Sequence, residues 1–372
     1  MRLAYVANIR LPTDRAHGIQ IMKTCEALAK YGISVELIIP NRRNEIKEDP
    51  FSYYEIEKNF VIKKLSCFDF IRHEKLGFLI RYVTFSLTSI KYCLKGDFDS
   101  IYSRDELPLW FLSFFEKKFF WEAHNGKWNF LVSCLVKSCS GIVVISNGIK
   151  NFLVGKGVDS SKIFVSPDAV ELGRFDIEIS KDKAREKLGL PKDKKIIMYT
   201  GHLYEWKGAD VLARSGELFG GDYFFVFVGG TLGHVEDFRN KYLRVNNLIV
   251  LGQKPHRDIP TYLKAADVLV IPNSGKEVVS RLYTSPMKLF EYMASGRPIV
   301  ASNLSSIREV LNESNAVFFE PDDSRGLSVA IKNVLENAKL SDQISRQALI
   351  DVAQYSWDNR AKNITSFIND KR

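Results

Sequence analysis

The sequence predicts an α/β protein made of two tandem Rossmann-like domains. Short apolar runs alternate with helical segments from the first residue onward, and this alternation is typical of a doubly wound parallel sheet. It occurs twice, and the polar stretch at residues 174–195 separates the two series as a linker. A chain of 372 residues is long enough for two domains of ordinary size. We therefore expect two open parallel sheets with a cleft between the domains.

The first series of elements predicts an amino-terminal domain at residues 1–175. Apolar residues recur at helical spacing over residues 19–32, which predicts an amphipathic helix between the first two strands. The strands are expected in five short apolar runs, at residues 2–8, 35–40, 100–103, 118–124 and 141–146.

The second series predicts a carboxy-terminal domain at residues 176–354. Open parallel sheets bind ligands at the carboxyl ends of their strands, so candidate site residues are sought in the loops that directly follow strands. The expected strands of this domain are residues 196–201, 223–230, 248–252, 267–272 and 299–302.

The stretch SPMKLFEYMASGRPIVAS predicts a capped helix followed by a buried strand. Ser285 suits the N-cap, Pro286 the first helical position, and Gly296 the end of the helix. Glu291 falls on the same helix face as Met287. A carboxylate on this otherwise apolar face requires an explanation.

The composition favours a cytoplasmic protein with an anionic partner. The net charge of +9 and the pI near 9.1 suggest a nucleotide, an acidic lipid surface or a nucleic acid. The five cysteines include no C-x-x-C pair, so neither a disulfide framework nor a structural zinc site is expected. No apolar run is long enough for a transmembrane helix, and the amino terminus reads as a strand rather than a signal peptide.

Lys207 is a candidate phosphate ligand. It stands in TGHLYEWKGADVL, after a predicted strand and directly before a predicted helix. A lysine at a helix amino terminus adds a full charge to the positive end of the helix dipole, and this arrangement suits a phosphate. The alternative is a solvated lysine in a polar loop.

The order of these segments carries a family resemblance. The sequence resembles the family 4 retaining glycosyltransferases of the GT-B fold, also called glycosyltransferase group 1. The resemblance extends over nearly the whole chain, and its tail resembles the family's last helix, so a helix at about 355–372 is expected to complete the first domain. The segments that carry it are YGISVELIIP, WEAHN, IVVISNGIK, VSPDAVELGRF, YTGHLYEWKGADVL, AADVLVIPN and SPMKLFEYMASGRPIVAS.

The resemblance implies a set of donor-binding residues. The Glu291 carboxylate would accept hydrogen bonds from both ribose hydroxyls of a nucleotide sugar, and amides at the start of its helix would hold the sugar or pyrophosphate. The alternative for Glu291 is a surface pair with Lys288. Gly18 would let the backbone approach the donor, or would only shape a turn. The implied donor-binding residues are Gly18, Gly201, His202, Lys207, Ser285, Met287 and Glu291.

Two positions depart from the family pattern. Tyr283 stands where the family has a glutamate near the transferred sugar, and this difference leaves the identity of the sugar open. His202 stands where the family often has an arginine, so Lys207 would carry more of the diphosphate charge. Arg281 either helps Lys207 or is a solvated loop charge.

His124 and Arg104 are the candidates in the first domain. His124 matches the family histidine beside the transferred sugar, and the implied role is hydrogen bonding to that sugar rather than proton abstraction. Arg104 follows the strand SIYS and is a candidate on the acceptor side. The Asp97-Phe98-Asp99 triplet precedes a strand and reads as a turn, so no metal and no cofactor are expected.

The resemblance, together with these residues, implies a metal-independent, retaining hexosyltransferase. It would transfer a hexose from a UDP- or GDP-sugar to a glycan or lipid-linked acceptor, and the resemblance implies cell-envelope polysaccharide or glycolipid synthesis as the setting. One alternative is a non-catalytic subunit that binds sugar nucleotides, and another is an epimerase or phosphorylase on the same fold. A nucleic-acid partner is supported only by the pI and is not expected.

Residues 58–95 combine basic and aromatic side chains, among them Lys63, Lys64 and Arg72. One interpretation is peripheral association with the inner face of an anionic membrane. The other is an ordinary helix with a core-facing side formed by Leu76, Leu79, Val83, Leu87, Ile90 and Leu94.

Overall fold

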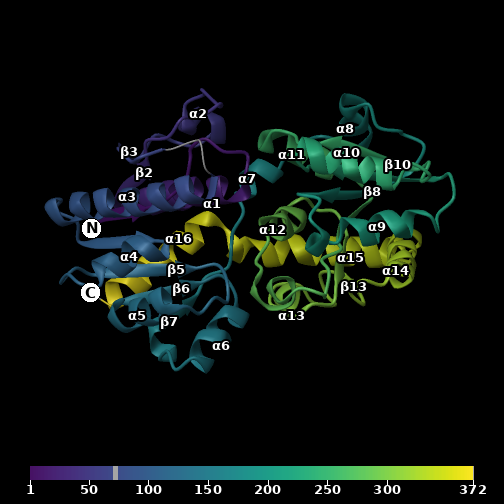
Figure 1. Cartoon of the computed structure of the whole chain (residues 1–372). Helices are drawn as coiled ribbons and strands as arrows, with labels where there is room; N and C mark the ends of the chain where they lie inside the picture. Colours follow the sequence, from purple (N-terminus) through teal and green to yellow (C-terminus); the bar gives the residue numbers. More distant parts are fainter. Residues whose placement is uncertain (70–73, 372) are drawn as a thin grey trace. The chain divides into compact units, whose positions relative to one another are not determined.

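The computed structural model describes residues 1–69 and 74–371, which form two compact units (Figure 1). One unit contains Met1–Asp168 together with Trp357–Arg372, and the other contains Ala169–Ser356. The boundary between them follows Asp168, whereas the sequence analysis placed it after residue 175.

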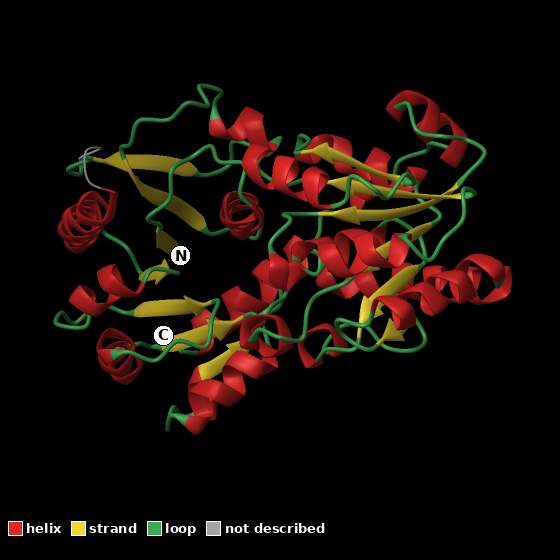
Figure 2. Cartoon of the chain, turned by 45° about the vertical axis from the view of Figure 1, so that its right-hand side comes forward, coloured by secondary structure: helices red, strands yellow, loops and turns green. Residues whose placement is uncertain are grey.

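Seven parallel strands form the sheet of the amino-terminal unit, in the order β3-β2-β1-β4-β5-β6-β7. Figure 2 shows the strands of this sheet flanked by helices. The strands are β1 (Arg2–Val6), β2 (Ser34–Pro40), β3 (Val61–Leu65), β4 (Ser100–Ser103), β5 (Phe119–Ala123), β6 (Gly141–Val144) and β7 (Ile163–Val165). The helices are α1 (Ala16–Lys30), α2 (Pro50–Tyr54), α3 (Glu74–Lys95), α4 (Glu106–Leu112), α5 (Phe130–Ser138), α6 (Asn147–Gly155) and α16 (Trp357–Asp370).

The central strands of this sheet are covered on both faces. Every residue of β4, β5 and β6 is buried, which is why these strands appear in the sequence as continuous apolar runs. Helix α16, yellow in Figure 1, packs beside α1 and buries Ile364 and Ile368 completely. Phe367 on α16 stacks on Phe164 with 5.3 Å between the ring centroids.

Six parallel strands form the sheet of the carboxy-terminal unit, in the order β10-β9-β8-β11-β12-β13. The predicted α/β class with two Rossmann-like sheets is therefore confirmed. The strands are β8 (Lys195–Thr200), β9 (Tyr223–Val228), β10 (Leu248–Gly252), β11 (Val268–Ile271), β12 (Ile299–Ser302) and β13 (Val317–Phe319). The helices are α7 (Leu172–Phe175), α8 (Lys181–Leu188), α9 (Ala209–Gly216), α10 (Leu232–Lys241), α11 (Ile259–Ala265), α12 (Met287–Ala294), α13 (Ser305–Arg308), α14 (Ser324–Glu336) and α15 (Ala338–Asp351).

The prediction of a linker at residues 174–195 is wrong, because α8 forms within it. Ser180 caps this helix by accepting a hydrogen bond from the backbone of Lys183, and Gly189 ends it with a φ of 64°. The buried guanidinium of Arg185 forms an ion pair with Asp267 at 2.5 Å. This segment looked like a linker because charged side chains, rather than an apolar stripe, make its main contacts.

The predicted start of α12 is also corrected. The helix begins at Met287 with Pro286 at the N-cap position, and no side chain caps it, so Ser285 is not the cap. The predicted end is right, because Gly296 follows the helix with a φ of 69°.

Helix α3 does not present all of its predicted apolar side to the core. Leu76, Leu79 and Leu87 are half exposed or more, whereas Ile90 is 5% exposed. The core-facing interpretation is therefore wrong for Leu76, Leu79 and Leu87. Arg72 lies outside the described residues. Within the described ranges, none of the helices has both the length and the apolar character needed to cross a membrane.

Candidate functional site

The carboxyl end of β8 and the start of α12 form the centre of the candidate site in the carboxy-terminal unit. The hydroxyl of Tyr292 on α12 accepts a hydrogen bond from the backbone N–H of Thr200 at 2.7 Å. This bond holds the helix against the end of the strand. The arrangement brings Lys288 of α12 close to Gly201, in the loop that follows β8.

A glycine fixes the position of Lys207 in that loop. Gly208 has a φ of 71°, and a Cβ atom there would lie 1.7 Å from the carbonyl oxygen of Pro272. No side chain fits at that distance, so the loop can pass close to the residue that follows β11 only because position 208 is glycine. Lys207 is thereby held at the ends of β8 and β11, where open parallel sheets bind their ligands.

Lys207 is a partly buried cation that pairs with no carboxylate in the described part of the chain. Its Nζ atom lies 5.1 Å from the ring centroid of Trp206. Burial lowers the pKa of Lys207 to about 8. An anion that binds beside Lys207 would raise the pKa of the lysine again, because it would stabilise the protonated form.

Lys288 is a second cation at the same place, and the sequence analysis did not select it. Its side chain is only 8% exposed, its Nζ has no hydrogen-bond partner among the described residues, and it lies 4.0 Å from the ring centroid of Tyr199. Burial and the nearby charge of Lys207 lower the pKa of Lys288 well below its ordinary value, against the opposite influence of Glu291. The alternative of a surface pair between Lys288 and Glu291 is therefore wrong.

Glu291 is held by a histidine from another loop. The Nε2 atom of His256 lies 2.7 Å from Oε1 of Glu291, and Nη1 of Arg174 lies 3.0 Å from Nδ1 of His256. Because a guanidinium can only donate, Nδ1 accepts and Nε2 carries the proton that is donated to Glu291. The carboxylate is 8% exposed. Its Oε1 is therefore oriented, and its Oε2 keeps its hydrogen-bonding capacity.

The other predicted residues of this unit lie around the same strand ends. Gly201 follows β8 with a φ of 133°, and a Cβ atom there would lie 3.9 Å from Cδ of Lys288. The ring of His202 stacks on Tyr204 with 5.1 Å between centroids. Ser285 is buried and Met287 is partly buried, at the uncapped start of α12.

Tyr283 and Arg281 lie in a π-helical turn, Val279–Tyr283, directly before α12. The guanidinium of Arg281 donates to the carbonyl oxygens of Gly275 at 2.8 Å and Lys276 at 3.2 Å. These bonds hold the guanidinium against its own loop. Turns of this kind often occur at functional sites.

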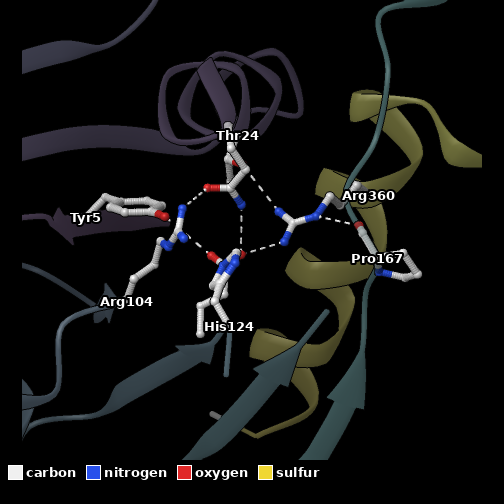
Figure 3. Close-up of polar contacts among 8 residues, drawn as sticks. Tyr5, Thr24, Arg104, His124, Pro167 and Arg360 are labelled. Atoms are coloured by element: carbon white, nitrogen blue, oxygen red, sulfur yellow. Dashed lines mark hydrogen bonds and ion pairs between the residues drawn. The ribbon is translucent and has the colours of Figure 1, made fainter. Parts of the chain in front are cut away.

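A buried carboxylate organises the candidate site of the amino-terminal unit (Figure 3). Glu122 on β5 is completely buried and accepts four hydrogen bonds from side chains of four elements or loops. Burial alone would raise its pKa, but Arg360 and the hydrogen bond from His124 hold the pKa of Glu122 well below its ordinary value. The four donors are Tyr5 (3.3 Å), Gln20 (2.9 Å), His124 (2.9 Å) and Arg360 (2.6 Å).

His124 has one defined protonation state in this cluster. Burial, and then the charge of Arg104, lowers the pKa of His124 to about 4, so the ring is neutral at pH 7. Its Nε2 faces the ionised Glu122, which can only accept, and therefore carries the proton. Nδ1 is left as a hydrogen-bond acceptor on a side chain that is 17% exposed.

Arg104 and Gly18 belong to the same region. Nη1 of Arg104 donates to the side-chain oxygen of Gln20 at 2.6 Å, so Arg104 reaches the Glu122 cluster through Gln20. A Cβ atom on Gly18 would lie 2.3 Å from the hydroxyl of Tyr54. That contact by itself explains why position 18 is glycine. The Asp97-Phe98-Asp99 triplet lies in the loop between α3 and β4, and Asp99 accepts a hydrogen bond from the backbone of Arg2 at 2.7 Å.

The carboxy-terminal unit matches a known family. Residues 180–350 match the family model described as glycosyl transferases group 1. These residues form a group 1 glycosyl transferase domain. The resemblance predicted from the sequence is thus confirmed for this part of the chain.

Several curated relatives of this chain are named as glycosyltransferases. It is 28% identical over 176 residues to the putative teichuronic acid biosynthesis glycosyltransferase TuaC of Bacillus subtilis (strain 168), which covers 47% of this chain and 41% of TuaC. It is 29% identical over 196 residues to the UDP-Gal:alpha-D-GlcNAc-diphosphoundecaprenol alpha-1,3-galactosyltransferase of Escherichia coli, which covers 50% of this chain and 48% of the relative. The chain spans about half the length of the curated relatives it matches.

Solved structures share the fold over the whole chain. Sucrose-phosphate synthase (tll1590) from Thermosynechococcus elongatus superposes with a TM-score of 0.79 at 18% identity, over 99% of this chain and 98% of that chain. Anabaena Alr3699/HepE in complex with UDP-glucose gives a TM-score of 0.79 at 15% identity, over all of both chains. The fold of this chain is therefore GT-B, as predicted.

Proposed function

We propose that this chain is a retaining glycosyltransferase that transfers a hexose from a UDP- or GDP-sugar to a hydroxyl group of a glycan or lipid-linked acceptor. The observation that carries the proposal is the pair of lysines, Lys207 and Lys288, at the strand ends of a group 1 glycosyl transferase domain. Two cations that lack carboxylate partners are costly to bury, and a bound diphosphate would remove that cost.

In this proposal the diphosphate of the donor binds to Lys207, Lys288 and the uncapped start of α12. The helix start offers backbone N–H groups and the positive end of the helix dipole. Lys288 supplies a second cation for the diphosphate. This role would otherwise fall to the family arginine, which His202 replaces in this chain. Two lysines can balance the charge of the leaving diphosphate, so the proposed reaction needs no metal.

Glu291 is proposed to bind the ribose. A carboxylate can accept two vicinal hydroxyls, and the hydrogen bond from His256 to Oε1 orients the carboxylate while leaving Oε2 with its acceptor capacity. His124 is proposed to bind the transferred hexose. Its Nδ1 is an acceptor, and the low pKa of its ring argues for hydrogen bonding to a sugar hydroxyl rather than proton abstraction.

The proposed biological setting is the synthesis of cell-envelope polysaccharide or glycolipid. TuaC is named for teichuronic acid biosynthesis, and the galactosyltransferase of Escherichia coli is named for an acceptor carried on diphosphoundecaprenol. The HepE structures are described as complexes with UDP and with UDP-glucose. These names support a nucleotide-sugar donor and an acceptor attached to a carrier or a growing glycan.

We further propose that the chain works in the cytoplasm at the inner face of the membrane. Leu76, Phe78 and Leu79 on α3 are 55%, 52% and 55% exposed, and Lys63 and Lys64 on β3 are exposed cations of the same unit. Apolar and basic side chains together favour an anionic membrane surface. Charge reversal at Lys63 and Lys64 should release the protein from anionic vesicles, and a wild-type protein that ignores such vesicles at low salt would contradict this proposal.

A panel of nucleotide sugars tests the proposed activity. The chain is incubated with UDP-glucose, UDP-galactose and GDP-mannose, with and without a glycan acceptor, and the release of UDP or GDP is measured. Release that depends on Lys207 supports the transferase. Tight binding without any release would favour the alternative of a non-catalytic sugar-nucleotide-binding subunit, which the tyrosine at position 283 keeps under consideration.

A further inference from the structure

A cationic cavity in the amino-terminal unit lies outside the residues used so far. It has a volume of about 260 Å³ and is lined by the loops that follow β1 and β2 and by strand β3. Six of its lining residues are charged, and five of them are cations. These residues are Arg10, Arg42, Arg43, Lys47, Lys64 and the single carboxylate Glu48.

The cations of this cavity outnumber the carboxylates near them: Glu48 lines the cavity, and Asp69, which is paired with Arg81, acts on Arg42. In the described part of the chain their only hydrogen bonds go to backbone carbonyls, from Arg10 to Arg43 at 3.5 Å and from Lys47 to Asn44 at 2.8 Å. The Nε atom of Arg42 is buried without any hydrogen-bond partner. A buried guanidinium N–H that no protein group satisfies indicates a missing partner.

The position and the chemistry of the cavity both suit a phosphate. The lining loops follow the carboxyl ends of two parallel strands, which is where open α/β sheets bind ligands. Arginine presents a planar fork of donors that matches phosphate oxygens, and lysine adds a point charge. Five like charges around one hollow repel each other, and an anion with two or more charges would remove that repulsion.

We propose that this cavity binds the phosphate or diphosphate group of the acceptor substrate. The assignment to an acceptor rests on the proposed transferase function, whereas the assignment of an anion rests on the cavity alone. The group could belong to a phosphorylated soluble sugar or to the head of a lipid carrier, and both sources present the same phosphate oxygens to Arg42 and Lys64.

Strand β3 offers a matched pair of lysines for the test. Lys64 lines the cavity, whereas the Nζ of the neighbouring Lys63 lies 5.5 Å from the ring centroid of Tyr92 on α3. Successive residues of a strand point to opposite faces, so Lys63→Gln and Lys64→Gln remove the same charge from different surroundings. Both side chains are exposed, so neither change should affect folding.

The experiment is a calorimetric titration of the full chain with inorganic pyrophosphate, in the presence of saturating UDP to occupy the proposed donor site. Arg42→Gln should weaken pyrophosphate binding about 10-fold or more, and Lys64→Gln should weaken it several-fold. Lys63→Gln should leave the dissociation constant unchanged. Equal affinities in wild type, Arg42→Gln and Lys64→Gln would overturn the proposal.

A second arm identifies the source of the phosphate. Vesicles of phosphatidylcholine with 30% phosphatidylglycerol are mixed with the same variants at low salt. If Arg42→Gln weakens both vesicle and pyrophosphate binding, the cavity takes a lipid headgroup. If it weakens pyrophosphate binding alone, the cavity takes a free phosphorylated substrate. The titration requires no turnover, so a chain without transferase activity would refute the proposed function and still leave this result in place.

Discussion

His256 donates its Nε2–H to Oε1 of Glu291 across 2.7 Å, and Arg174 donates to the other ring nitrogen across 3.0 Å. Arg174, His256 and Glu291 thus form a hydrogen-bonded chain in which the position of each proton is defined. The Glu291 side chain is therefore already oriented in the empty protein, so it loses little conformational entropy when the donor binds at the proposed ribose site.

Glu291→Ala should lower kcat/KM for the nucleotide sugar by at least about 100-fold. Two hydrogen bonds to a charged acceptor contribute roughly 1.5–3 kcal/mol each, and both would be lost. The free energy of unfolding should also fall, since His256 loses its acceptor in a site where the carboxylate is 8% exposed. The control is a donor that contains 2′-deoxyribose. If replacing the normal donor with this one lowers kcat/KM by the same factor in Glu291→Ala as in wild type, Glu291 does not bind the ribose.

His256→Ala should raise the KM for the donor about 10-fold and change kcat less, because the histidine orients Glu291 without touching the substrate. His256→Gln retains a side-chain N–H and should recover most of the loss. Steady-state kinetics of the two variants test this role. A purely structural histidine would give equal losses in both variants.

Donor affinity should fall as the pH rises through 8. The pKa of Lys207 in the empty protein is about 8, so at higher pH the lysine is neutral and binding must first take up a proton. Between pH 7 and pH 9 this requirement weakens UDP binding by about 10-fold. Lys207→Arg stays charged and should show a flatter profile than wild type in calorimetry, and equal slopes would remove Lys207 from the diphosphate site.

Lys288→Met should stabilise the empty protein and impair donor binding at the same time. Its Nζ is buried without a hydrogen-bond partner, a condition that costs about 1–3 kcal/mol, and methionine fills a similar volume without that cost. Urea unfolding should shift to higher concentration while the dissociation constant for UDP rises about 10-fold or more. Lys339→Met, at an exposed position of α15, is the control and should change neither quantity.

The stability of the amino-terminal unit should depend on His124 between about pH 6.5 and pH 4. The pKa of His124 is lowered to about 4 by burial and Arg104, so in this window the unfolded chain binds a proton that the folded chain does not. Acidification therefore favours unfolding, and from pH 7 to pH 5 the contribution of this one group is about 1–2 kcal/mol. His17, with a pKa also near 4, acts in the same direction.

The measurement is the difference between His124→Asn and wild type, in urea unfolding at pH 7 and at pH 5. Because His17 and the other titrating groups are present in both proteins, the difference isolates His124. The variant should lose less stability than wild type on acidification. Parallel losses would mean that the histidine titrates normally in the folded protein.

Most central strands could be predicted from the sequence, whereas three strands could not. The missed strands are β3, β7 and β13, and each forms an edge of its sheet. An edge strand is covered on fewer sides, so β3 carries the exposed Lys63 and Lys64 where a central strand would carry apolar residues. Strands β7 and β13 are apolar but only three residues long each, so their runs are too short to stand out in the sequence.

The candidate sites could be predicted only where a local motif carries them. Lys207, Glu291 and His124 stand in recognisable segments, but His256 precedes its partner Glu291 by 35 residues and Arg360 follows Glu122 by 238. No local pattern announces a pairing over such distances. Two signals could have been used, because Glu122 and Lys288 are charged residues inside otherwise apolar segments. Charged residues are seldom buried without a partner, so each of them indicates an interaction.

The bond between Glu122 and Arg360 sets an order of events during synthesis. Every strand of the first sheet leaves the ribosome well before α16, yet the charge that balances Glu122 arrives 238 residues after it. Until α16 is translated, Glu122 lacks the Arg360 guanidinium, and the carboxylate that holds His124 is less firmly fixed. The histidine that we propose to bind the sugar is thus fully surrounded only after the second unit and then α16 have been translated.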